Sequence, residues 1–417
     1  MFTARKVGLF IMALLLCVGC GSMVAAGNDD HRIKVKIDRR VNIVPGSNTR
    51  AMMGMVRNPI DGTIYLNTQY QGLYKSTDNG LSWAASPVTF TDVPVAERPT
   101  QRVHGLGVSS TGRLYLLHQR GGTGELYIST LAHGDDSETD WDTTAVDWAN
   151  MNLPGTVPYS GGYNSDADQD YNSFVELPDG TMMTAIELLY PEAQDYLGSP
   201  TKSGLHETVI RSTDNGATWG TPTSMHQFVA ETSLAINPND STNILAMTRI
   251  QRGLLPGEDQ ATVMALSGCP NPDWTDTQAY KNGILLESND SGNTFHEVTG
   301  GLGGYYEFRG TALWTPNDTV VIAHQDGYSG GGMTGEVFAR ISLDSGKTWV
   351  DGTKTGTSMF NLSKKFQLVP SPPGHSFTTP TVEISPNNYL TTYAHNDAAG
   401  KLAISGVFWH IEPASGN

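Results

Sequence analysis

The segment Ser212–Trp219 (STDNGATW) holds the residue types that a tight turn between two β-strands requires. Its Asp can accept hydrogen bonds from backbone N–H groups two residues on, and its Gly can take the positive φ that such a turn needs. Its Ser and Thr hydroxyls can tie the turn to the flanking strands, while its Trp packs into the apolar layer beneath. The segment therefore predicts a closed turn between two strands.

The same pattern, S-x-D-x-G-x-[TS]-[WF], occurs four times in the chain. The other copies are Ser76–Trp83 (STDNGLSW), Ser288–Phe295 (SNDSGNTF) and Ser342–Trp349 (SLDSGKTW). This pattern resembles the Asp-box, or bacterial neuraminidase repeat, of the sialidase superfamily. We expect a structural role for its acidic residues, which are Asp78, Asp214, Asp290 and Asp344.

A second, longer repeat underlies these turns. Each unit has an apolar strand, a turn around Pro or Asp-Gly, a second apolar strand, and a third strand that leads into the turn pattern. Short strands at this spacing predict an all-β fold, a six-bladed β-propeller of four-stranded antiparallel blades. The six units begin near Arg50, Arg102, Asn172, Glu231, Arg309 and Thr378.

Residues 32–44 (RIKVKIDRRVNIV) precede the first unit and read as one more strand. Pairing this strand with the last blade would close the ring and remove two exposed sheet edges. Unit two ends without a full turn pattern, near Asp140–Trp141, and the last unit ends in residues 402–412. We expect one domain over residues 32–417, with loops at 133–168, 189–206, 251–281 and 350–374.

The N-terminus, residues 1–26, reads as a secretory signal. Arg5 and Lys6 precede an apolar run from Val7 to Val18, which is too short and wrongly flanked for a membrane span. The following Val-Gly-Cys resembles a lipobox, with Cys20 as the lipidated residue, and Val24–Ala26 is an alternative cleavage site. We therefore expect an extracytoplasmic protein, either a bacterial cell-envelope lipoprotein or a secreted one.

The composition suits an extracytoplasmic all-β protein. The 417 residues include 46 Gly and 22 Pro, and only 16% are charged. Three Cys, two of them inside the signal, leave no disulfide framework. The formal net charge of −16 argues against nucleic acid or an anionic membrane surface as a partner. It does not exclude an acidic small substrate, because a pocket can be locally positive.

Polar residues recur where the predicted first strands begin and the second strands end. In a propeller these strand ends lie on one face around the axis, so the side chains can converge on one pocket. The strand starts supply Arg50, Arg102, His104, Glu231, Glu307 and Arg309. The strand ends supply Gln69, His118, Glu187, Arg249, His324 and His395. Solvation by the central channel, or mutual pairing, is the alternative role for these charges.

The resemblance to sialidases assigns roles to part of this set. It implies that Arg50 and Arg249 bind a substrate carboxylate, for which the guanidinium fork is suited. It implies that Glu231 activates a tyrosine nucleophile. For the third arginine of that family we favour Arg309, because Arg340 adjoins a turn pattern and is expected to face outward.

Other parts of the sialidase pattern are absent. The hairpin Asn67–Gly72 lacks the acid/base carboxylate, and residues 375–378 lack the expected tyrosine. We therefore propose Glu187 as a general acid opposite Glu231, and Tyr393 as a nucleophile.

The leading functional hypothesis is an exo-glycosidase that removes a terminal acidic sugar, most simply sialic acid, from an anionic glycan. One alternative is a uronate-directed polysaccharide lyase that uses His118, His324 and His395 with the arginines as substrate-binding groups. Another is a non-catalytic glycan-binding propeller. Neither zinc at these histidines nor calcium at Asp166–Asp170 is expected, and we expect no cofactor and a monomer.

Overall fold

The computed structural model describes residues 33–47, 54–68, 72–86, 102–119, 126–134, 141–146, 173–189, 205–227, 229–252, 259, 280–298, 310–325, 336–352, 365–370 and 378–413. Within these residues all regular structure is β-strand. None of their segments is a helix long and apolar enough to cross a membrane. The predicted signal, Cys20 and Asp166–Asp170 lie outside the described residues.

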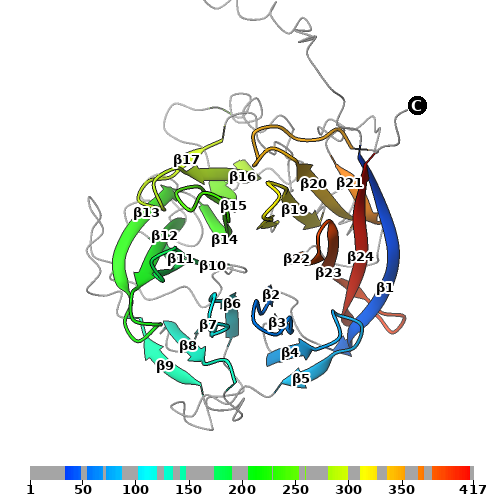
Figure 1. Ribbon diagram of the computed structural model, residues 1–417, viewed down its shortest axis with the longest axis horizontal. Helices are drawn as coiled ribbons and strands as arrows, with labels where there is room; N and C mark the ends of the chain where they lie inside the picture. The colour runs from blue at the N-terminus through cyan, green and yellow to red at the C-terminus, as the bar shows by residue number, and fades with distance from the viewer. Residues whose placement is uncertain are drawn as a thin grey trace, which may run out of the picture.

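The strands form six antiparallel sheets of four strands each, arranged as blades around one axis (Figure 1). The predicted six-bladed β-propeller is therefore confirmed. Blade one contains β2 (Met55–Arg57), β3 (Ile64–Thr68), β4 (Gly72–Ser76) and β5 (Ala84–Ser86). Blade two contains β6 (Arg102–Val108), β7 (Leu114–Gln119), β8 (Leu126–Leu131) and β9 (Asp142–Ala145). Blade three contains β10 (Phe174–Glu176), β11 (Met182–Leu189), β12 (Leu205–Ser212) and β13 (Gly220–Gln227).

The second half of the ring repeats this order, from inner to outer strand. Blade four contains β14 (Val229–Ile236), β15 (Ile244–Arg252), β16 (Tyr280–Ser288) and β17 (His296–Glu297). Blade five contains β18 (Thr311–Trp314), β19 (Val320–Gln325), β20 (Val337–Ser342) and β21 (Phe366–Val369). Blade six contains β22 (Thr381–Ser385), β23 (Asn388–Asn396), β24 (Leu402–Pro413) and β1 (Ile33–Ser47).

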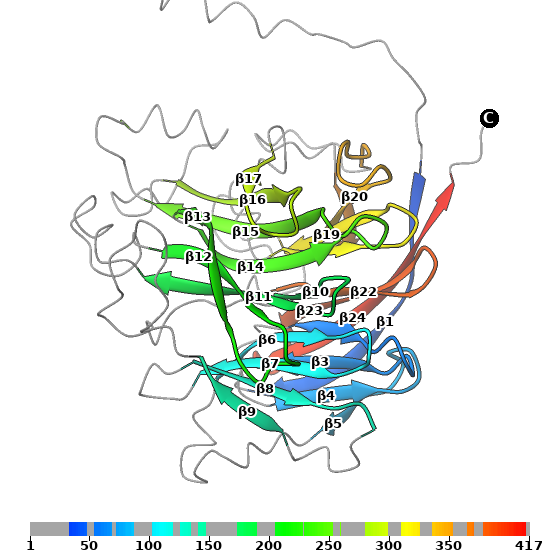
Figure 2. The ribbon, with the colours of Figure 1, turned by 60° about the vertical axis from the view of Figure 1, so that its left-hand side comes forward.

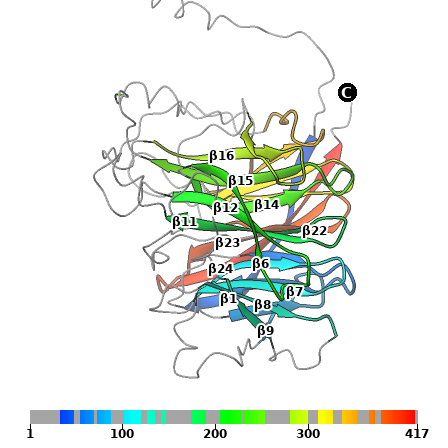
Figure 3. The ribbon, with the colours of Figure 1, turned by 90° about the vertical axis from the view of Figure 1, so that its left-hand side faces the viewer.

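The hydrophobic core lies between the blades, which stack face to face around the ring (Figures 2 and 3). Six buried clusters are found, and each contains residues of two neighbouring blades. A central strand is therefore covered on both faces. In β15, Ile244 and Ala246 pack against blade three, whereas Leu245 and Met247 pack against blade five. This is why the second strands read as nearly continuous apolar runs.

The four repeated turns join the third and fourth strands of blades one, three, four and five. In Ser212–Trp219, Asp214 Oδ1 accepts from Thr218 N at 2.8 Å, and its Oδ2 accepts from Thr218 Oγ1 at 2.6 Å. Ser212 Oγ accepts from Gly216 N at 2.8 Å. The same bonds recur in the other copies, which supports a structural role for their carboxylates.

The glycine of each turn also meets the preceding blade. A Cβ added at Gly80, Gly216, Gly292 or Gly346 would lie within 3.3 Å of a side chain on that blade. A residue of the second strand is contacted in each case: Leu390, Tyr115, Met183 and Leu245. Gly80 and Gly216 also meet a third-strand residue, Phe408 and Thr130 respectively. The turns therefore lock neighbouring blades together as well as closing hairpins.

Blade two uses a tryptophan without the rest of the turn pattern. Trp141 directly precedes β9, as Trp219 precedes β13, and it is 1% exposed. It packs with Leu106, Leu116 and Leu131 in the cluster between blades one and two. The apolar part of the turn is thus kept where the polar part is lost.

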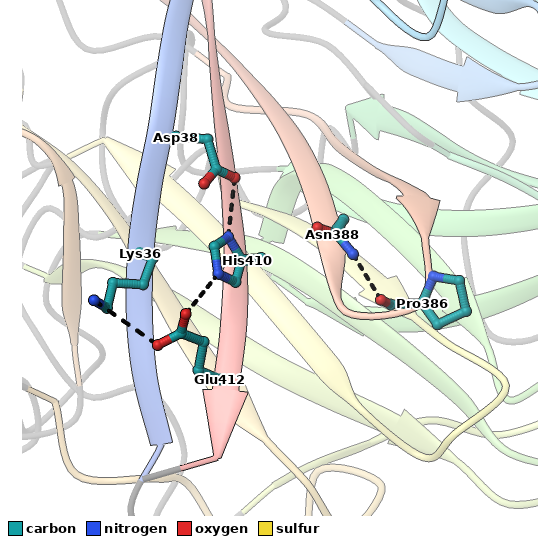
Figure 4. Close-up of polar contacts among 6 residues, drawn as sticks. All are labelled: Lys36, Asp38, Pro386, Asn388, His410 and Glu412. Carbon is teal, nitrogen blue, oxygen red and sulfur yellow. Dashed lines mark hydrogen bonds and ion pairs between the residues drawn. The ribbon is translucent and has the colours of Figure 1, made fainter. Parts of the chain in front are cut away.

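The predicted closing strand is confirmed. β1 pairs with β24 along its length, from Ile33 opposite Pro413 to Ser47 opposite Leu402. Side chains add links at this pair (Figure 4): His410 Nδ1 of β24 lies 3.0 Å from Asp38 Oδ2 of β1, and His410 Nε2 lies 3.1 Å from Glu412 Oε1 on its own strand. Lys36 Nζ lies 3.8 Å from Glu412 Oε2.

Two of the predicted loops are wrong in part. β9 lies inside 133–168 and β21 lies inside 350–374. Both are outer strands of only four residues, and β9 (DTTA) carries little of the apolar alternation by which a strand is recognised.

Candidate active site

The two ends of the blades carry different connections. At one end, which we call the turn end, lie the first-to-second-strand turns and the four repeated turns. At the other, the connection end, strands are joined by the longest segments of the chain, 146–173 and 253–279. Because binding residues of such scaffolds are carried by long connections, the connection end is the candidate functional face.

The first strand of blade four bears an irregular residue at this end. Ala230 lies opposite Arg249 and Ser233 lies opposite Met247, so Glu231 and Thr232 together oppose the single residue Thr248. Glu231 has φ of +61° in this bulge. A non-glycine residue in the left-handed region costs about 1–3 kcal/mol, and such strain gathers at functional sites. Bulges of this kind re-aim a side chain.

The bulge brings Glu231 to Arg249. Arg249 Nη1 lies 2.8 Å from Glu231 Oε1, and the two side chains are 3% and 0% exposed. Both side chains of this ion pair are buried, whereas those of the other ion pairs between described residues are partly exposed. A buried pair gains little net stability over apolar residues, but removing one partner costs about 3–5 kcal/mol. The structure thus shows the mutual pairing that was named above as the alternative role of these charges, and the assignment of both residues to a substrate site stays a prediction.

Hydroxyl groups support the two residues that follow Glu231. Thr232 Oγ1 donates to Thr248 Oγ1 at 2.9 Å. Ser233 Oγ accepts from the backbone N of Ala312 in blade five at 3.1 Å. All four residues are buried. The pair Glu231–Arg249 is thus flanked by a bond within its blade and a bond to the next blade.

Arg249 defines a strand position that is also polar in blades two, three and five. It lies five residues after Ile244, where β15 begins. The equivalent residues, counted from the first residue of β7, β11 and β19, are Gln119, Glu187 and Gln325, while the same count from β3 reaches Gln69, which lies outside the described residues. Gln325 is fully buried, and its Nε2 donates to Ala394 O of blade six at 3.2 Å. Glu187 is thus placed on the same register position as Arg249.

His118 and His324 lie one residue before that position, so they face the other side of their blades. Both are buried, at 0% and 1% exposure. Burial lowers the pKa of His118 to about 3, and its Nε2 lies 2.7 Å from Ser129 Oγ. Burial and the nearby Arg340 hold the pKa of His324 well below its ordinary value. Both histidines are therefore neutral groups of the blade interior.

Tyr393 and His395 lie together in blade six. Tyr393 bonds to Ser405 and belongs to the core cluster between blades five and six. His395 Nε2 lies 2.8 Å from the same Ser405 Oγ, which donates to Asn42 Oδ1 on β1 at 3.2 Å. Burial raises the pKa of Tyr393, against the opposing effect of Arg40. Tyr393 thus lies opposite Ser405 of β24 in the strand register.

The remaining candidates are described less fully. Arg50 and Arg309 lie outside the described residues. Arg102 and Glu187 are placed by their backbones only, at the start of β6 and near the end of β11. Their assignments as substrate-binding and acid residues stay predictions. In the register of blade three, Glu187 lies directly opposite Glu207, which is fully buried.

The sequence missed a buried basic group in blade five. Arg340 is 2% exposed, so the expectation that it faces outward is wrong. β20 lies between β19 and β21 and is covered by blades on both faces, which buries all its residues. Lys365 is 1% exposed, and its Nζ lies 5.3 Å from the centre of the Phe338 ring. Burial lowers the pKa of Lys365 to about 7.

The acidic and histidine side chains do not gather elsewhere into a metal-binding arrangement. Within the described ranges, no group of three or more His, Cys, Asp and Glu residues could hold a metal ion. The candidate site therefore consists of Glu231 and Arg249, with their hydroxyl neighbours, at the connection end of blade four.

Comparison with known proteins gives neighbours in structure. No protein-family model and no curated protein matches the chain. A protein of unknown function from Dyadobacter fermentans matches with a TM-score of 0.58 and 16% identity, over 91% of this chain and 99% of that one. A Hadza microbial sialidase matches with a TM-score of 0.53 and 13% identity, over 88% of this chain and 66% of that one. A polysaccharide lyase matches with a TM-score of 0.45 and 8% identity, over 87% of this chain and 77% of that one.

At these identities the likeness concerns the fold. The sialidase shares the arrangement of blades, and the chain spans about two thirds of its length. The four repeated turns, the ring of six blades and this neighbour agree with one another. The chain thus has a six-bladed β-propeller fold, to which the fold of this sialidase is similar.

Proposed function

We propose that the protein is a sialidase-like exo-glycosidase that hydrolyses a terminal acidic sugar, most simply sialic acid, from an anionic glycan. The observation that carries the proposal is the buried pair of Glu231 and Arg249 in a strained bulge at the connection end of blade four. The sequence resemblance assigned the same two residues, and the superfamily fold supports the class of reaction.

In the proposed site Arg249 binds the carboxylate of the sugar. A guanidinium offers a planar fork that matches a carboxylate, and Glu231 at 2.8 Å fixes its orientation. The other proposed carboxylate-binding groups are Arg50, Arg102 and Arg309. Two or more arginines on one carboxylate would make the site selective for acidic sugars despite the net charge of −16.

Glu231 is the proposed base. In this scheme its carboxylate accepts the proton of the attacking nucleophile, and a second carboxyl group, Glu187, donates a proton to the leaving oxygen. Tyr393 is the nucleophile candidate that the sequence offers, although its hydroxyl bonds to Ser405 in the folded chain. A retaining reaction needs such a nucleophile, whereas an inverting one uses an activated water.

The competing functions make different demands on the histidines. A β-eliminating lyase would require His118, His324 or His395 to exchange protons with substrate. His118 and His324 are enclosed in blade interiors, which does not favour that use. A glycan-binding propeller without catalysis would use the arginines alone.

The deciding experiment is incubation of the purified protein with a mixed panel of anionic glycans. Release of free sialic acid, or of another terminal acidic sugar, supports the proposal. An unsaturated uronate that absorbs in the ultraviolet would assign the protein to the lyases instead. Binding without any product would leave a glycan-binding propeller. Glu231→Gln is the control. If a contaminating enzyme forms the product, a preparation of this variant will form the same product.

We also propose that the protein acts outside the cytoplasm, anchored by a lipid on Cys20. The support is the apolar run followed by Val18, Gly19 and Cys20. Mass spectrometry of the mature N-terminus in the native host tests this. A lipid mass on Cys20 is expected, and a free N-terminus at Gly27 would show ordinary cleavage after Ala26.

A further inference from the structure

The bulge in β14 places Glu231 at a break in the regular register of strand pairing. In a regular antiparallel pair each residue has one partner, which fixes the face on which its side chain lies. Here Glu231 and Thr232 share the single partner Thr248. A φ of +61° is a conformation that glycine adopts more readily than glutamate. Something besides strand pairing must hold this backbone in place.

The hydroxyl of Thr232 supplies a contact at the right position. It donates to Thr248 Oγ1 at 2.9 Å, and Thr248 is the residue directly before Arg249. Adjacent residues on β14 and β15 are therefore joined twice: Glu231 to Arg249 by charge and Thr232 to Thr248 by hydroxyls. The second link ties the bulge to the strand that carries the arginine.

Ser233 anchors the other side of the bulge. Its Oγ accepts from Ala312 N at 3.1 Å, which connects β14 to the first strand of blade five. Since Ser233 returns to regular pairing opposite Met247, the bulge is fixed at its C-terminal end by a neighbouring blade. Glu231 and Thr232 are the two residues that lie between the regular pairs of Ala230 and Ser233.

We propose that Thr232 is a positioning residue for the proposed active site, and that its hydroxyl bond to Thr248 holds Glu231 in the orientation that meets Arg249. The proposal rests on the function proposed above for that pair. Without the bond, the strained backbone at Glu231 can relax and turn the carboxylate away, while Arg249 stays on its regular strand.

Blade six provides a matched control. Thr381 and Thr391 form the same kind of inner-strand bond, with their hydroxyl oxygens 2.8 Å apart, and Thr381 is 2% exposed. Thr381 and its two neighbours have no positive φ, and no ion pair adjoins this bond among the described residues. Thr381→Val therefore removes a hydroxyl bond of the same kind with no adjoining residue of positive φ, while Thr391 Oγ1 still accepts from Trp409 Nε1 at 2.9 Å.

The experiment compares Thr232→Val, Thr232→Ser and Thr381→Val in the full chain. Valine keeps the shape and removes the hydroxyl, whereas serine keeps the hydroxyl. Turnover is measured on the acidic-sugar substrate that the glycan panel identifies. We expect Thr232→Val to lower kcat at least tenfold with KM changed less than threefold, because Arg249 remains in place. Thr232→Ser and Thr381→Val should stay within threefold of the wild type.

A second readout does not depend on activity. The side-chain N–H signals of Arg249 in nitrogen-15 NMR, assigned by their loss in Arg249→Lys, report the contact with Glu231. We expect these signals to move in Thr232→Val and not in Thr381→Val. If the wild type releases no sugar, the proposed function fails, and this readout still decides the positioning role.

Two results would overturn the proposal. One is equal kcat for Thr232→Val and Thr381→Val at similar losses of melting temperature, which would make the bond merely structural. The other is an unchanged Arg249 signal in a folded Thr232→Val protein. If Thr232→Val fails to fold, Thr248→Val removes the same hydroxyl bond from its other partner. A tenfold or greater loss of kcat in Thr248→Val supports the positioning role, and an unaltered kcat refutes it.

Discussion

Gly216 of blade three lies directly against Tyr115 of blade two: a Cβ added to Gly216 would lie 3.2 Å from Tyr115 Cε1 and 2.7 Å from Thr130 Cγ2. The repeated turn is therefore also an inter-blade contact. Two constraints favour glycine at this position: the backbone φ of +92°, and the neighbouring blade, which leaves no room for a Cβ.

The losses of unfolding free energy in Gly216→Ala and Gly180→Ala should separate these two constraints. Gly180 has φ of +85°, yet a Cβ there meets nothing within 4 Å. We expect Gly180→Ala to cost about 1 kcal/mol from backbone strain. Gly216→Ala should cost a further 1–3 kcal/mol or so, because the methyl group must displace packed side chains. Chemical denaturation measures both, and equal losses would show that the turn does not lock the blades.

Glu231 and Arg249 can be tested as a pair, so that structural and catalytic roles separate. Glu231→Gln should lower turnover by a factor of about 10² or more, and Arg249→Lys should chiefly raise KM for the acidic substrate. Each single variant should also lose stability, on the order of 3–5 kcal/mol for a fully removed partner.

The double variant Glu231→Leu with Arg249→Met is the control for this pair. It should recover much of the lost stability, since apolar residues of similar volume replace a buried ion pair well. It should remain inactive. Activity in the stable double variant would mean that the pair serves the blade and not the reaction.

Lys365 should make stability depend on pH above neutrality. Its pKa is lowered to about 7 from 10.5, so the unfolded chain binds more protons between these values. Stability contributed by this site therefore rises with pH from about 7 to about 10.5 and is lowest below that window. Lys365→Met should stabilise the protein more at pH 7 than at pH 10. Unfolding free energies at the two pH values measure this, and a pH-independent difference would contradict it.

His410 should act in the opposite direction. Its bonds to Asp38 and Glu412 raise its pKa above the ordinary value of 6.5, with Lys36 also bound to Glu412. Its contribution is thus fully present below the unfolded pKa and is lost as pH rises through the folded pKa. His410→Gln should weaken β1 pairing at pH 5.5 and have little effect at pH 8.5.

Hydrogen exchange of the β1 amides is the measurement for His410. His296→Gln is a suitable comparison, because His296 has a single carboxylate 3.6 Å away and lies on the edge strand β17. Equal effects of the two substitutions on β1 protection would contradict a specific role for His410.

The fold could be predicted because its signals are local and repeated. The turn pattern specifies its own hydrogen bonds, and the closing strand follows from one unpaired apolar–polar alternation at residues 32–44. β9 and β21 were not predicted, because the formation of a short outer strand depends more on the strand edge with which it pairs than on its own residues.

The sequence could indicate that Glu231 and Arg249 lie near each other, but it could not give the geometry in which they meet. Glu231 and Arg249 stand at strand ends, which a strand pattern locates to within about a residue or two. One extra residue in β14 decides where Glu231 points, and no sequence pattern signals a bulge without a glycine. A shift of one residue likewise separates the Arg249 position from His118 and His324, because side chains alternate between faces.

The closure of the ring also sets the order in which the protein can be made. Asp38 and His410 are separated by 372 positions in the chain, yet they belong to one blade. Among the described strands of the ring, β1 leaves the ribosome first and its partner β24 leaves last. Blades one to five can therefore assemble during translation, while β1 remains unpaired along both edges until β24 has been synthesised. Its charged residues Lys34, Lys36, Arg39 and Arg40 are suited to this interval, because charge on an open strand discourages pairing with other nascent chains.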